Sequence, residues 1–332
     1  KPMTKFKFLI LILLFAAFLI TSCEKDEEAV NESQVLAEYL ESADSPYGKD
    51  FVNTDMPTIM PASEVKTLNE TGQVYIMDIR SAADFALGHI TNAHNVALAD
   101  IVTHIAGLDL TPYTKVAVVC YTGQTSGYAT SILRLLGYEK AFSMKWGMCA
   151  WNEAFAGKWN TAIANGNAYA SQFTATATAK NAVGEMPVLS TGKTTGQEIL
   201  EARVAALLAE GFTPATVTNQ TVFGALSSYY IVNYWPADQY ADPGHIPGAI
   251  QYTPKESMKV AVDLKTLPTD KPLAVYCYTG QTSAFLTVYL RLLGYDAKSI
   301  LYGTNAMIYD QMVAKNMTTW SAAQIMGYDF EQ

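Results

Sequence analysis

The sequence predicts an α/β fold built from two copies of one domain, each with a mainly parallel sheet covered by helices on both faces. Three observations predict this fold. A long segment is repeated at a nearly constant offset. Within each copy, short apolar runs of strand length alternate with segments of helical periodicity. The chain has 332 residues, 50% of them hydrophobic and 16% charged, which is enough for two domains with a core each.

The repeat is centred on a cysteine loop. The segment VVCYTGQTS around Cys120 returns as VYCYTGQTS around Cys277, 157 residues later. Two flanking motifs recur at nearly the same spacing: LRLLGY at 133–138 and 290–295, and GHI at 88–90 and 244–246. Offsets that stay this constant over a long stretch indicate a duplicated domain.

The order of segments along the chain follows from this repeat. We expect a signal peptide at 1–22, a tether with an N-terminal helix at 23–55, a first domain at 56–160, a linker at 161–185 and a second domain at 186–332. The linker is inferred from a stretch rich in Thr, Ala and Asn with little apolar periodicity. The second domain is expected to begin with a helix at 197–210, which Gly211 ends.

In the first copy, each expected helix follows a short apolar strand. The expected strands are 74–79, 115–120 and 141–144, and the expected helices are 82–87, 124–136 and 149–155. Ligands of parallel sheets bind beyond the carboxyl ends of the strands. Cys120 and Cys277 both lie at that end of their strands.

The N-terminus predicts export and lipidation. Lys5 and Lys7 precede the uncharged run 8–20, which suits a signal peptide and is too short to span a bilayer comfortably. The alternative is a short buried helix. The run ends in ITSC, which resembles the bacterial lipobox and makes Cys23 the expected lipidation site, carrying acyl chains such as palmitate. We therefore expect a protein of the cell envelope, anchored by lipid to a bacterial membrane.

The acidic run EKDEE after the lipobox has two interpretations. It resembles the surface-export signal of some Gram-negative lipoproteins, which favours the outer membrane and its exposed face, or it is a solvated tether. The formal net charge of −9, with no basic run after the first few residues, excludes nucleic acid as a partner. The sequence does not indicate an oligomeric state.

Four cysteines are present, and their spacing fits neither a disulfide framework nor a metal site. If Cys23 carries lipid, three thiols remain in an exported protein, which suggests a use for them. Cys120 and Cys277 are the expected catalytic residues. Cys149 has no counterpart in the second copy, and we interpret it as a packing residue rather than a resolving thiol.

The cysteine loops have the chemistry of an anion site. A turn between a buried strand and a helix directs successive backbone N–H groups inward at the helix N-terminus, where an anionic sulfur is stabilised. The residues expected to bind the sulfur substrate are Tyr121, Thr122, Gly123, Gln124, Thr125 and Ser126 in the first loop, and Tyr278, Thr279, Gly280, Gln281, Thr282 and Ser283 in the second.

Taken with the motifs DIR at 78–80, DF at 84–85, GHI at 88–90 and the segment 146–151, the cysteine loop resembles the rhodanese superfamily. The resemblance covers both repeats, roughly 56–160 and 186–315. It implies an α/β fold and a cysteine that takes a sulfane sulfur from a small anionic donor such as thiosulfate and passes it to a thiol acceptor through a persulfide. It also implies that no metal or organic cofactor takes part.

Other residues of these motifs are expected to be structural. The resemblance assigns His89 and His245 mainly to the scaffold, and Asp78 and Arg80 are expected to form a buried or half-buried ion pair. The second repeat departs from the pattern at three places. It has Asn233 and Trp235 in place of the ion pair, and Tyr302 near the position of Trp146.

Two other functions are known for proteins with features of this kind. Dual-specificity phosphatases share this fold but need Cys-X₅-Arg, and the equivalent positions here are Ser126 and Ser283, so a phosphatase is disfavoured. The second alternative is a non-catalytic surface module that binds or senses sulfur or relays it. It stays open because the loops lack the basic residue that many thiosulfate-preferring members have there.

Overall fold

The computed structural model describes residues 31–332. The expected signal peptide, the lipidation site at Cys23 and the acidic run lie outside the described residues. Within 31–332, no helix has both the length and the apolar character needed to cross a membrane.

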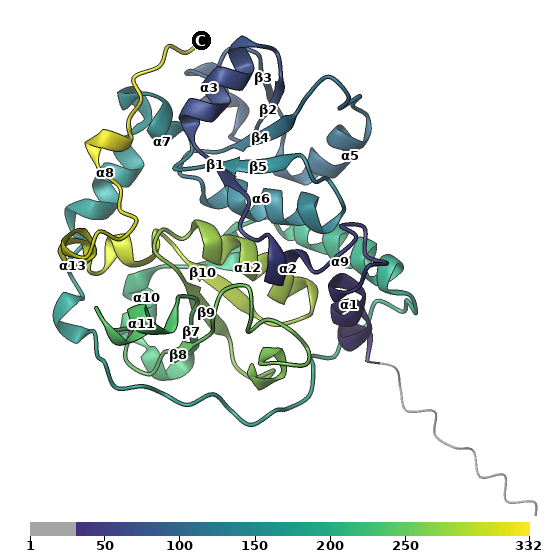
Figure 1. Ribbon diagram of the computed structural model, residues 1–332, viewed down its shortest axis with the longest axis vertical. Helices are drawn as coiled ribbons and strands as arrows, with labels where there is room; N and C mark the ends of the chain where they lie inside the picture. The colour runs from purple at the N-terminus through teal and green to yellow at the C-terminus, as the bar shows by residue number, and fades with distance from the viewer. Residues whose placement is uncertain (1–30) are drawn as a thin grey trace, which may run out of the picture. The chain divides into compact units, whose positions relative to one another are not determined.

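Two five-stranded sheets, each with every strand pair parallel, form the framework (Figure 1). The first consists of β1 (Ile59–Met60), β2 (Val74–Asp78), β3 (Ala93–Asn95), β4 (Lys115–Val119) and β5 (Ala141–Met144), in the order β1-β5-β4-β2-β3. The second consists of β6 (Thr216–Val217), β7 (Tyr230–Asn233), β8 (Ile250–Gln251), β9 (Leu273–Tyr276) and β10 (Ala297–Ile300), in the equivalent order β6-β10-β9-β7-β8. The predicted α/β fold with two repeats is confirmed.

The helices alternate with these strands. Those of the first repeat are α1 (Glu32–Glu41), α2 (Phe51–Thr54), α3 (Ala62–Glu70), α4 (Ala82–Ala86), α5 (Ile101–Ala106), α6 (Gln124–Leu135), α7 (Met148–Trp151) and α8 (Gly157–Ala164). Those that follow are α9 (Gly196–Glu210), α10 (Asn219–Gly224), α11 (Ala237–Ala241), α12 (Gln281–Leu292) and α13 (Tyr309–Ala314). Short 3₁₀ turns connect several of them.

Alternate residues of each strand face opposite layers, as the pleat requires. In the first sheet, Ile76 and Val119 pack towards α3 and α7, while Met77 and Val118 pack towards α5 and α6. Because both faces are covered, the strands are apolar throughout rather than alternating, which is the pattern that predicted them.

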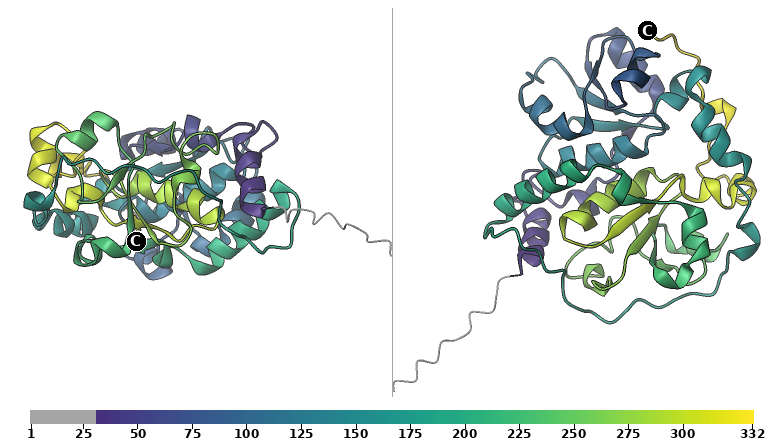
Figure 2. Two further views of the ribbon diagram at one scale, coloured as in Figure 1. Left: turned by 90° about the horizontal axis from the view of Figure 1, so that it is seen from below. Right: turned by 180° about the vertical axis from the view of Figure 1, so that it is seen from behind.

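Helices α6 and α12 lie between the two sheets and pack against each other (Figures 1 and 2). Tyr128 and Ile132 of α6 share one apolar cluster with Phe285 and Tyr289 of α12. The Ser131 hydroxyl also donates to the Phe285 carbonyl at 2.9 Å. Since each of these helices begins at its repeat's cysteine loop, the same contact brings the two loops together.

Each repeat extends an arm that pairs with the other repeat. In the C-terminal arm, which runs back to the first repeat in Figure 1, Glu331 pairs with His89 through two backbone hydrogen bonds of 2.8 and 2.9 Å. In the segment after α8, Thr174 pairs with His245 through two of 2.9 Å. Thr174 and Glu331 are 157 residues apart, which is the offset of the two cysteines. The arms are therefore exchanged symmetrically.

Two sequence expectations change in detail. The helix expected at 149–155 is two pieces, α7 and a 3₁₀ turn at Glu153–Phe155, because Asn152 adopts an extended conformation and caps the turn by accepting from the N–H of Ala154. The segment expected as a linker begins within α8, and it does not run free of the second repeat, since Phe173 packs on that repeat's apolar cluster.

Candidate functional site

Cys120 follows β4, and two backbone N–H groups of its own loop point at its sulfur. Those of Gly123 and Ser126 each lie 3.2 Å from Sγ, and the Ser126 hydroxyl oxygen lies 3.4 Å away. The side chain is 4% exposed. The thiol donates to the Ser126 hydroxyl oxygen, whereas the two N–H groups are donors from which an anionic sulfur would accept hydrogen bonds.

Cys277 occupies the same place after β9. The N–H of Ser283 lies 3.3 Å from its Sγ and the Ser283 hydroxyl 3.6 Å from it. The side chain is 2% exposed. The predicted inward-facing amides are present at both cysteines, with two aimed at the first sulfur and one at the second.

The start of each helix explains why these N–H groups are free. The first N–H groups of an α-helix have no partner inside the helix. Neither α6 nor α12 has a side-chain N-cap, and Gly123 and Gly280 precede them in the left-handed conformation, with φ of +85° and +76°. The sulfur therefore takes the place that a capping side chain would otherwise fill.

Two strand serines that were not predicted as site residues form hydrogen bonds with the cysteine loops. Ser143 of β5 lies 2.8 Å from the hydroxyl of Ser126, and Ser299 of β10 lies 2.7 Å from that of Ser283. All four hydroxyls are buried. The sequence did contain a signal for these residues: a serine recurs inside two apolar strands at an offset of 156. Because a buried hydroxyl needs a hydrogen-bond partner, this repeat could have predicted a polar contact at the same place in both domains.

Aromatic rings cover the first loop. The indole N–H of Trp159 donates to the carbonyl of Thr122 at 3.1 Å, and the ring packs edge-on against Trp146 and Tyr302. Trp320, from the C-terminal arm, stacks on Trp159 at 5.9 Å. The cover is thus built from both repeats. Nothing in the sequence around Trp159 distinguishes it as part of a site.

The glutamines of the two loops reach across to the opposite repeat. Gln124 accepts from the backbone N–H of Tyr302 at 2.7 Å, and Gln281 accepts from that of Trp146 at 3.1 Å. Both side chains are buried, with exposed fractions of 2% and 1%. The amide oxygens of both glutamines are therefore engaged between repeats, while the amide nitrogen of Gln124 donates to Oγ1 of Thr122 in its own loop at 3.1 Å. A contact between substrate and the backbone N–H groups of these residues stays a prediction.

The expected ion pair of the first repeat is present and buried. Arg80 binds Asp78 through Nε and Nη2, the closest contact being 2.6 Å, and also donates to the carbonyl of Gly88 at 2.7 Å. The guanidinium lies 5.3 Å from the ring centre of Tyr121, the residue after the cysteine. In the second repeat Asn233 donates instead to the Tyr276 hydroxyl at 2.8 Å.

The two histidines and the third thiol agree with structural roles. His89 stacks on Phe85, and His245 is fully buried and stacks on Tyr240. The thiol of Cys149 is fully buried, 3.1 Å from the carbonyl of Phe155. Burial raises the pKa of Cys149 to about 12, so this thiol is neutral at physiological pH and is a poor nucleophile.

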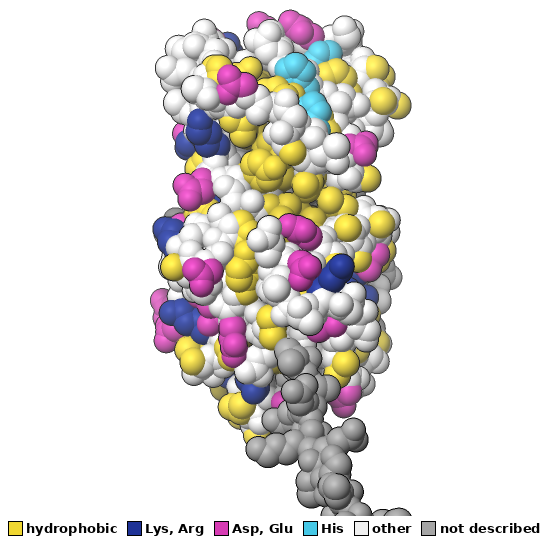
Figure 3. Space-filling view, turned by 90° about the vertical axis from the view of Figure 1, so that its right-hand side faces the viewer, with side chains coloured by type: hydrophobic (Ala, Val, Ile, Leu, Met, Phe, Trp, Pro, Cys, Tyr) yellow, Lys and Arg dark blue, Asp and Glu magenta, His cyan; other side chains and the backbone are white. Residues whose placement is uncertain are grey.

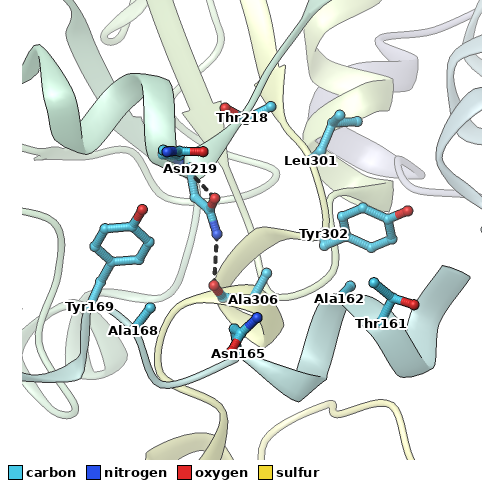
Figure 4. Close-up of a pocket in the computed structure, with 11 residues that line it drawn as sticks. Thr161, Ala162, Asn165, Ala168, Tyr169, Thr218, Asn219, Leu301, Tyr302 and Ala306 are labelled. Atoms are coloured by element: carbon cyan, nitrogen blue, oxygen red, sulfur yellow. Dashed lines mark hydrogen bonds between the residues drawn. The ribbon is translucent and has the colours of Figure 1, made fainter.

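A cavity of about 380 Å³ lies beside Tyr302, between α8 of the first repeat and the start of α10 in the second (Figure 4). Asn165 and Tyr169 line it from the first repeat. From the second, Asn219 turns its amide to the carbonyl of Ala306. The lining, as far as the described residues go, carries no charged side chain, so it offers an anionic donor hydrogen bonds but no counter-charge.

A second cavity, of about 420 Å³, is apolar and lies between α5 and α9, on the face where hydrophobic side chains gather in Figure 3. Val102, Leu136, Val204 and Leu208 are among its lining residues. Its lining residues in the described chain include no member of either cysteine loop. We therefore place the candidate site at the cysteines and not at this cavity.

Together, the parallel sheets and the thiols at the carboxyl ends of their central strands define a duplicated α/β protein with two cysteine-centred sites. The rhodanese-like domain family matches residues 61–154 and 227–328, more than half of the chain. The chain belongs to this family, as its loop motifs predicted. Both matched ranges lie within the two expected domains.

Curated relatives are sulfurtransferases. The thiosulfate sulfurtransferase GlpE of Pseudomonas fluorescens (strain SBW25) is 32% identical over 108 residues, which cover 32% of this chain and 93% of that protein. GlpE of Shewanella oneidensis is 31% identical over 97 residues, covering 29% and 94%. Each of these relatives is thus about the length of one repeat.

The chain is also similar to solved structures, at low TM-scores. The sulfotransferase SseA of Escherichia coli, described as acting on 3-mercaptopyruvate, covers 79% of this chain and 98% of its own at 17% identity, with a TM-score of 0.28. A rhodanese-like domain protein of Staphylococcus aureus covers 27% and 87% at 24% identity, with a TM-score of 0.25. Both scores are low, and the fold assignment rests on the strand order and the family match.

Proposed function

We propose that the protein is a sulfurtransferase that carries a sulfane sulfur on Cys120 and Cys277. The observation that carries the proposal is the same at both sites: a thiol at the end of a central strand, with backbone N–H groups at 3.2 to 3.3 Å from its sulfur. The family and its sulfurtransferase members support this assignment. The substrates are a sulfur donor and a thiol acceptor.

The chemistry takes two steps. The cysteine thiolate attacks the outer sulfur of a donor such as thiosulfate, an S–S bond forms, the donor's S–S bond breaks, and sulfite leaves with the electron pair. An acceptor thiolate then attacks the outer sulfur of the persulfide and releases the cysteine thiolate. Backbone N–H groups stabilise the negative charge on sulfur in both steps, and being fixed by the helix they need no reorganisation.

A surface module that holds sulfur without turning it over is the second candidate. The specific observation that favours it is the low exposure of both thiols, 4% and 2%, together with the absence of Lys and Arg from the two loops. Such a module would form the persulfide and hold it. The two candidates differ in whether the acceptor can reach the outer sulfur.

Replacing both cysteines tests the proposal. The double variant Cys120→Ser/Cys277→Ser should lose thiocyanate formation from thiosulfate and cyanide by a factor on the order of a thousand or more, as expected when a covalent nucleophile is removed. Each single variant should retain the activity of its remaining site. Cys149→Ala, which changes only a buried packing residue, is the matched control and should stay near the starting activity.

Mass spectrometry of the same proteins after exposure to thiosulfate separates the two candidates. A sulfur atom gained at Cys120 or Cys277 and lost again on adding cyanide or a thiol supports the transferase. A sulfur atom that is gained and retained, without turnover, supports the sensing module. If neither cysteine takes up sulfur from thiosulfate or 3-mercaptopyruvate, both candidates are wrong.

We also propose that lipid on Cys23 anchors the protein to a bacterial membrane, on the strength of the ITSC segment and the apolar run before it. Cells grown with labelled palmitate should yield the labelled protein in the membrane fraction. Cys23→Ser should abolish the label and release the protein from membranes. Label that persists in this variant would contradict the assignment.

A further inference from the structure

The orientation of each cysteine loop is set by the segment that follows the last central strand of its own repeat. In the first repeat, the N–H groups of Met148 and Cys149 donate to the carbonyls of Cys120 and Tyr121, at 2.8 and 3.1 Å. A trans peptide is planar, with its N–H opposite its C=O. Holding these two carbonyls on one side therefore turns the N–H groups of Tyr121 and Thr122 to the other side of the loop.

The second repeat uses the same arrangement. The N–H groups of Thr304 and Asn305 donate to the carbonyls of Cys277 and Tyr278, both at 3.1 Å. The Asn305 side chain adds a hydrogen bond of 2.7 Å to the carbonyl of Tyr278. In both repeats, a displacement of this orienting segment would rotate the peptide groups that follow the cysteine.

Each orienting segment is held at its start by the other repeat. Trp146 begins the first segment and Tyr302 begins the second, both in the left-handed conformation, with φ of +65° and +62°. The N–H of Trp146 donates to Gln281 of the second cysteine loop, and the N–H of Tyr302 donates to Gln124 of the first. The two contacts are reciprocal, because each cysteine loop binds the orienting segment of the other repeat.

The glycine before each glutamine makes this exchange possible. A Cβ on Gly123 would lie 2.7 Å from Cδ of Gln281, and one on Gly280 would lie 3.0 Å from Cδ of Gln124. Any side chain there would push away the glutamine of the opposite loop. The Gly-Gln pair common to both loops is thus a complementary surface, in which each glycine receives the glutamine of the other repeat.

We propose that Gln124 and Gln281 are exchanged positioning residues: Gln281 sets the loop geometry at Cys120, and Gln124 sets that at Cys277. The two sulfur sites are therefore coupled, because each loop supplies the contact that orients the other. This inference rests on the proposed sulfur-transfer function, because the positioned thiols matter only if they carry sulfur. The contacts between the repeats do not depend on that function.

The alternative is that each glutamine acts within its own loop, where it lies four residues after the cysteine. The two possibilities predict opposite patterns. A local role makes a change at Gln281 alter Cys277, whereas the exchanged role makes the same change alter Cys120. The pattern of effects at the two thiols therefore decides between them.

The experiment isolates one thiol at a time. All proteins carry Cys23→Ser and Cys149→Ala. One background adds Cys277→Ser, leaving Cys120, and the other adds Cys120→Ser, leaving Cys277. Gln281→Met and Gln124→Met, which keep the side-chain length but remove the amide, are placed in both backgrounds. Gln124→Met also removes the hydrogen bond from Gln124 Nε2 to Oγ1 of Thr122. The rate of alkylation by iodoacetamide is followed as a function of pH, with circular dichroism as a check on folding.

We expect Gln281→Met to slow alkylation of Cys120 at neutral pH by about tenfold, as expected when a hydrogen bond to the anionic sulfur is lost. Cys277 should change much less in the same variant. Gln124→Met should give the mirror result. Cys277 in the same Gln281→Met protein is the internal control, because a general loss of stability would change the reactivity of both thiols.

Same-repeat effects, equal effects at both thiols, or unchanged pH profiles would each overturn the exchange. The alkylation assay uses no sulfur donor, so it tests the exchanged role of the glutamines independently of the proposed sulfur-transfer function. A crossed alkylation pattern in a protein that transfers no sulfur would reject only the function. Normal transfer with an uncrossed pattern would reject only the exchange.

Discussion

Replacing Asp78 with alanine should lower the free energy of unfolding by roughly 3–5 kcal/mol, because it leaves the charge of Arg80 buried without a partner. The two side chains are 0% and 2% exposed, and their closest contact is 2.6 Å. Of the hydrogen bonds that Arg80 makes, the one to the carbonyl of Gly88 would remain. Urea unfolding followed by circular dichroism measures the loss.

A double variant identifies the cause of that loss. Asp78→Ala/Arg80→Met removes the charge as well as its partner, and should be more stable than Asp78→Ala alone, since the remaining cost is only that of packing. The second repeat provides the matched position, where Asn233 is buried but uncharged and its replacement by alanine should cost less. If the double variant were no more stable than the single one, the unpaired charge would not be the cause.

Replacing Gly147 with alanine should displace the loop of Cys120 and abolish most sulfur transfer at that site. Gly147 has φ of +59° and ψ of −153°, a region used essentially by glycine alone. A Cβ there would fall against the carbonyl oxygen of Cys120 and 2.5 Å from the carbonyl carbon of Tyr121. Both are backbone atoms of the site, so relief of the clash must move the loop. We expect a loss of stability of about 1–3 kcal/mol as well.

Two other glycines serve as controls for that variant. In Gly48→Ala the new Cβ meets open space at a position with φ of +74°. This variant therefore measures the cost of backbone strain alone, without displacement of the site. Gly303→Ala is the counterpart in the second repeat, where a Cβ would lie 2.7 Å from the carbonyl carbon of Tyr278, and should affect Cys277 instead. A Gly147→Ala protein in which Cys120 takes up and transfers sulfur at the original rate would contradict the account of this loop.

The local features of the fold could be predicted because they depend on local pattern. The runs around Val118 and Val275 are apolar on both faces, as strands of a covered parallel sheet must be, and Gly211 marks the end of α9. The cysteine loops could be located from their repetition alone. Their amide donors follow from the geometry of any helix that begins immediately after such a turn.

The contacts between repeats could not be predicted in this way. Gln124 and Gln281 were expected to face substrate, and no local pattern indicates that a buried amide will bind the backbone of a distant segment. The linker was expected from its composition, which is poor in apolar residues. Yet Phe173 and Thr174 stand 157 residues before Phe330 and Glu331, and this offset, equal to that of the cysteines, was a signal that the same contact is made twice.

The exchanged arms bear on how such a chain could have arisen. If one half is imagined alone, the surface that receives its arm and covers its central helix is missing. Two separate copies that exchanged arms in this way would clasp each other as a twofold dimer. Joining two copies end to end makes that clasp intramolecular and independent of concentration. Covalently joined copies can differ in sequence, as at the equivalent positions Asp78 and Asn233, and still remain associated.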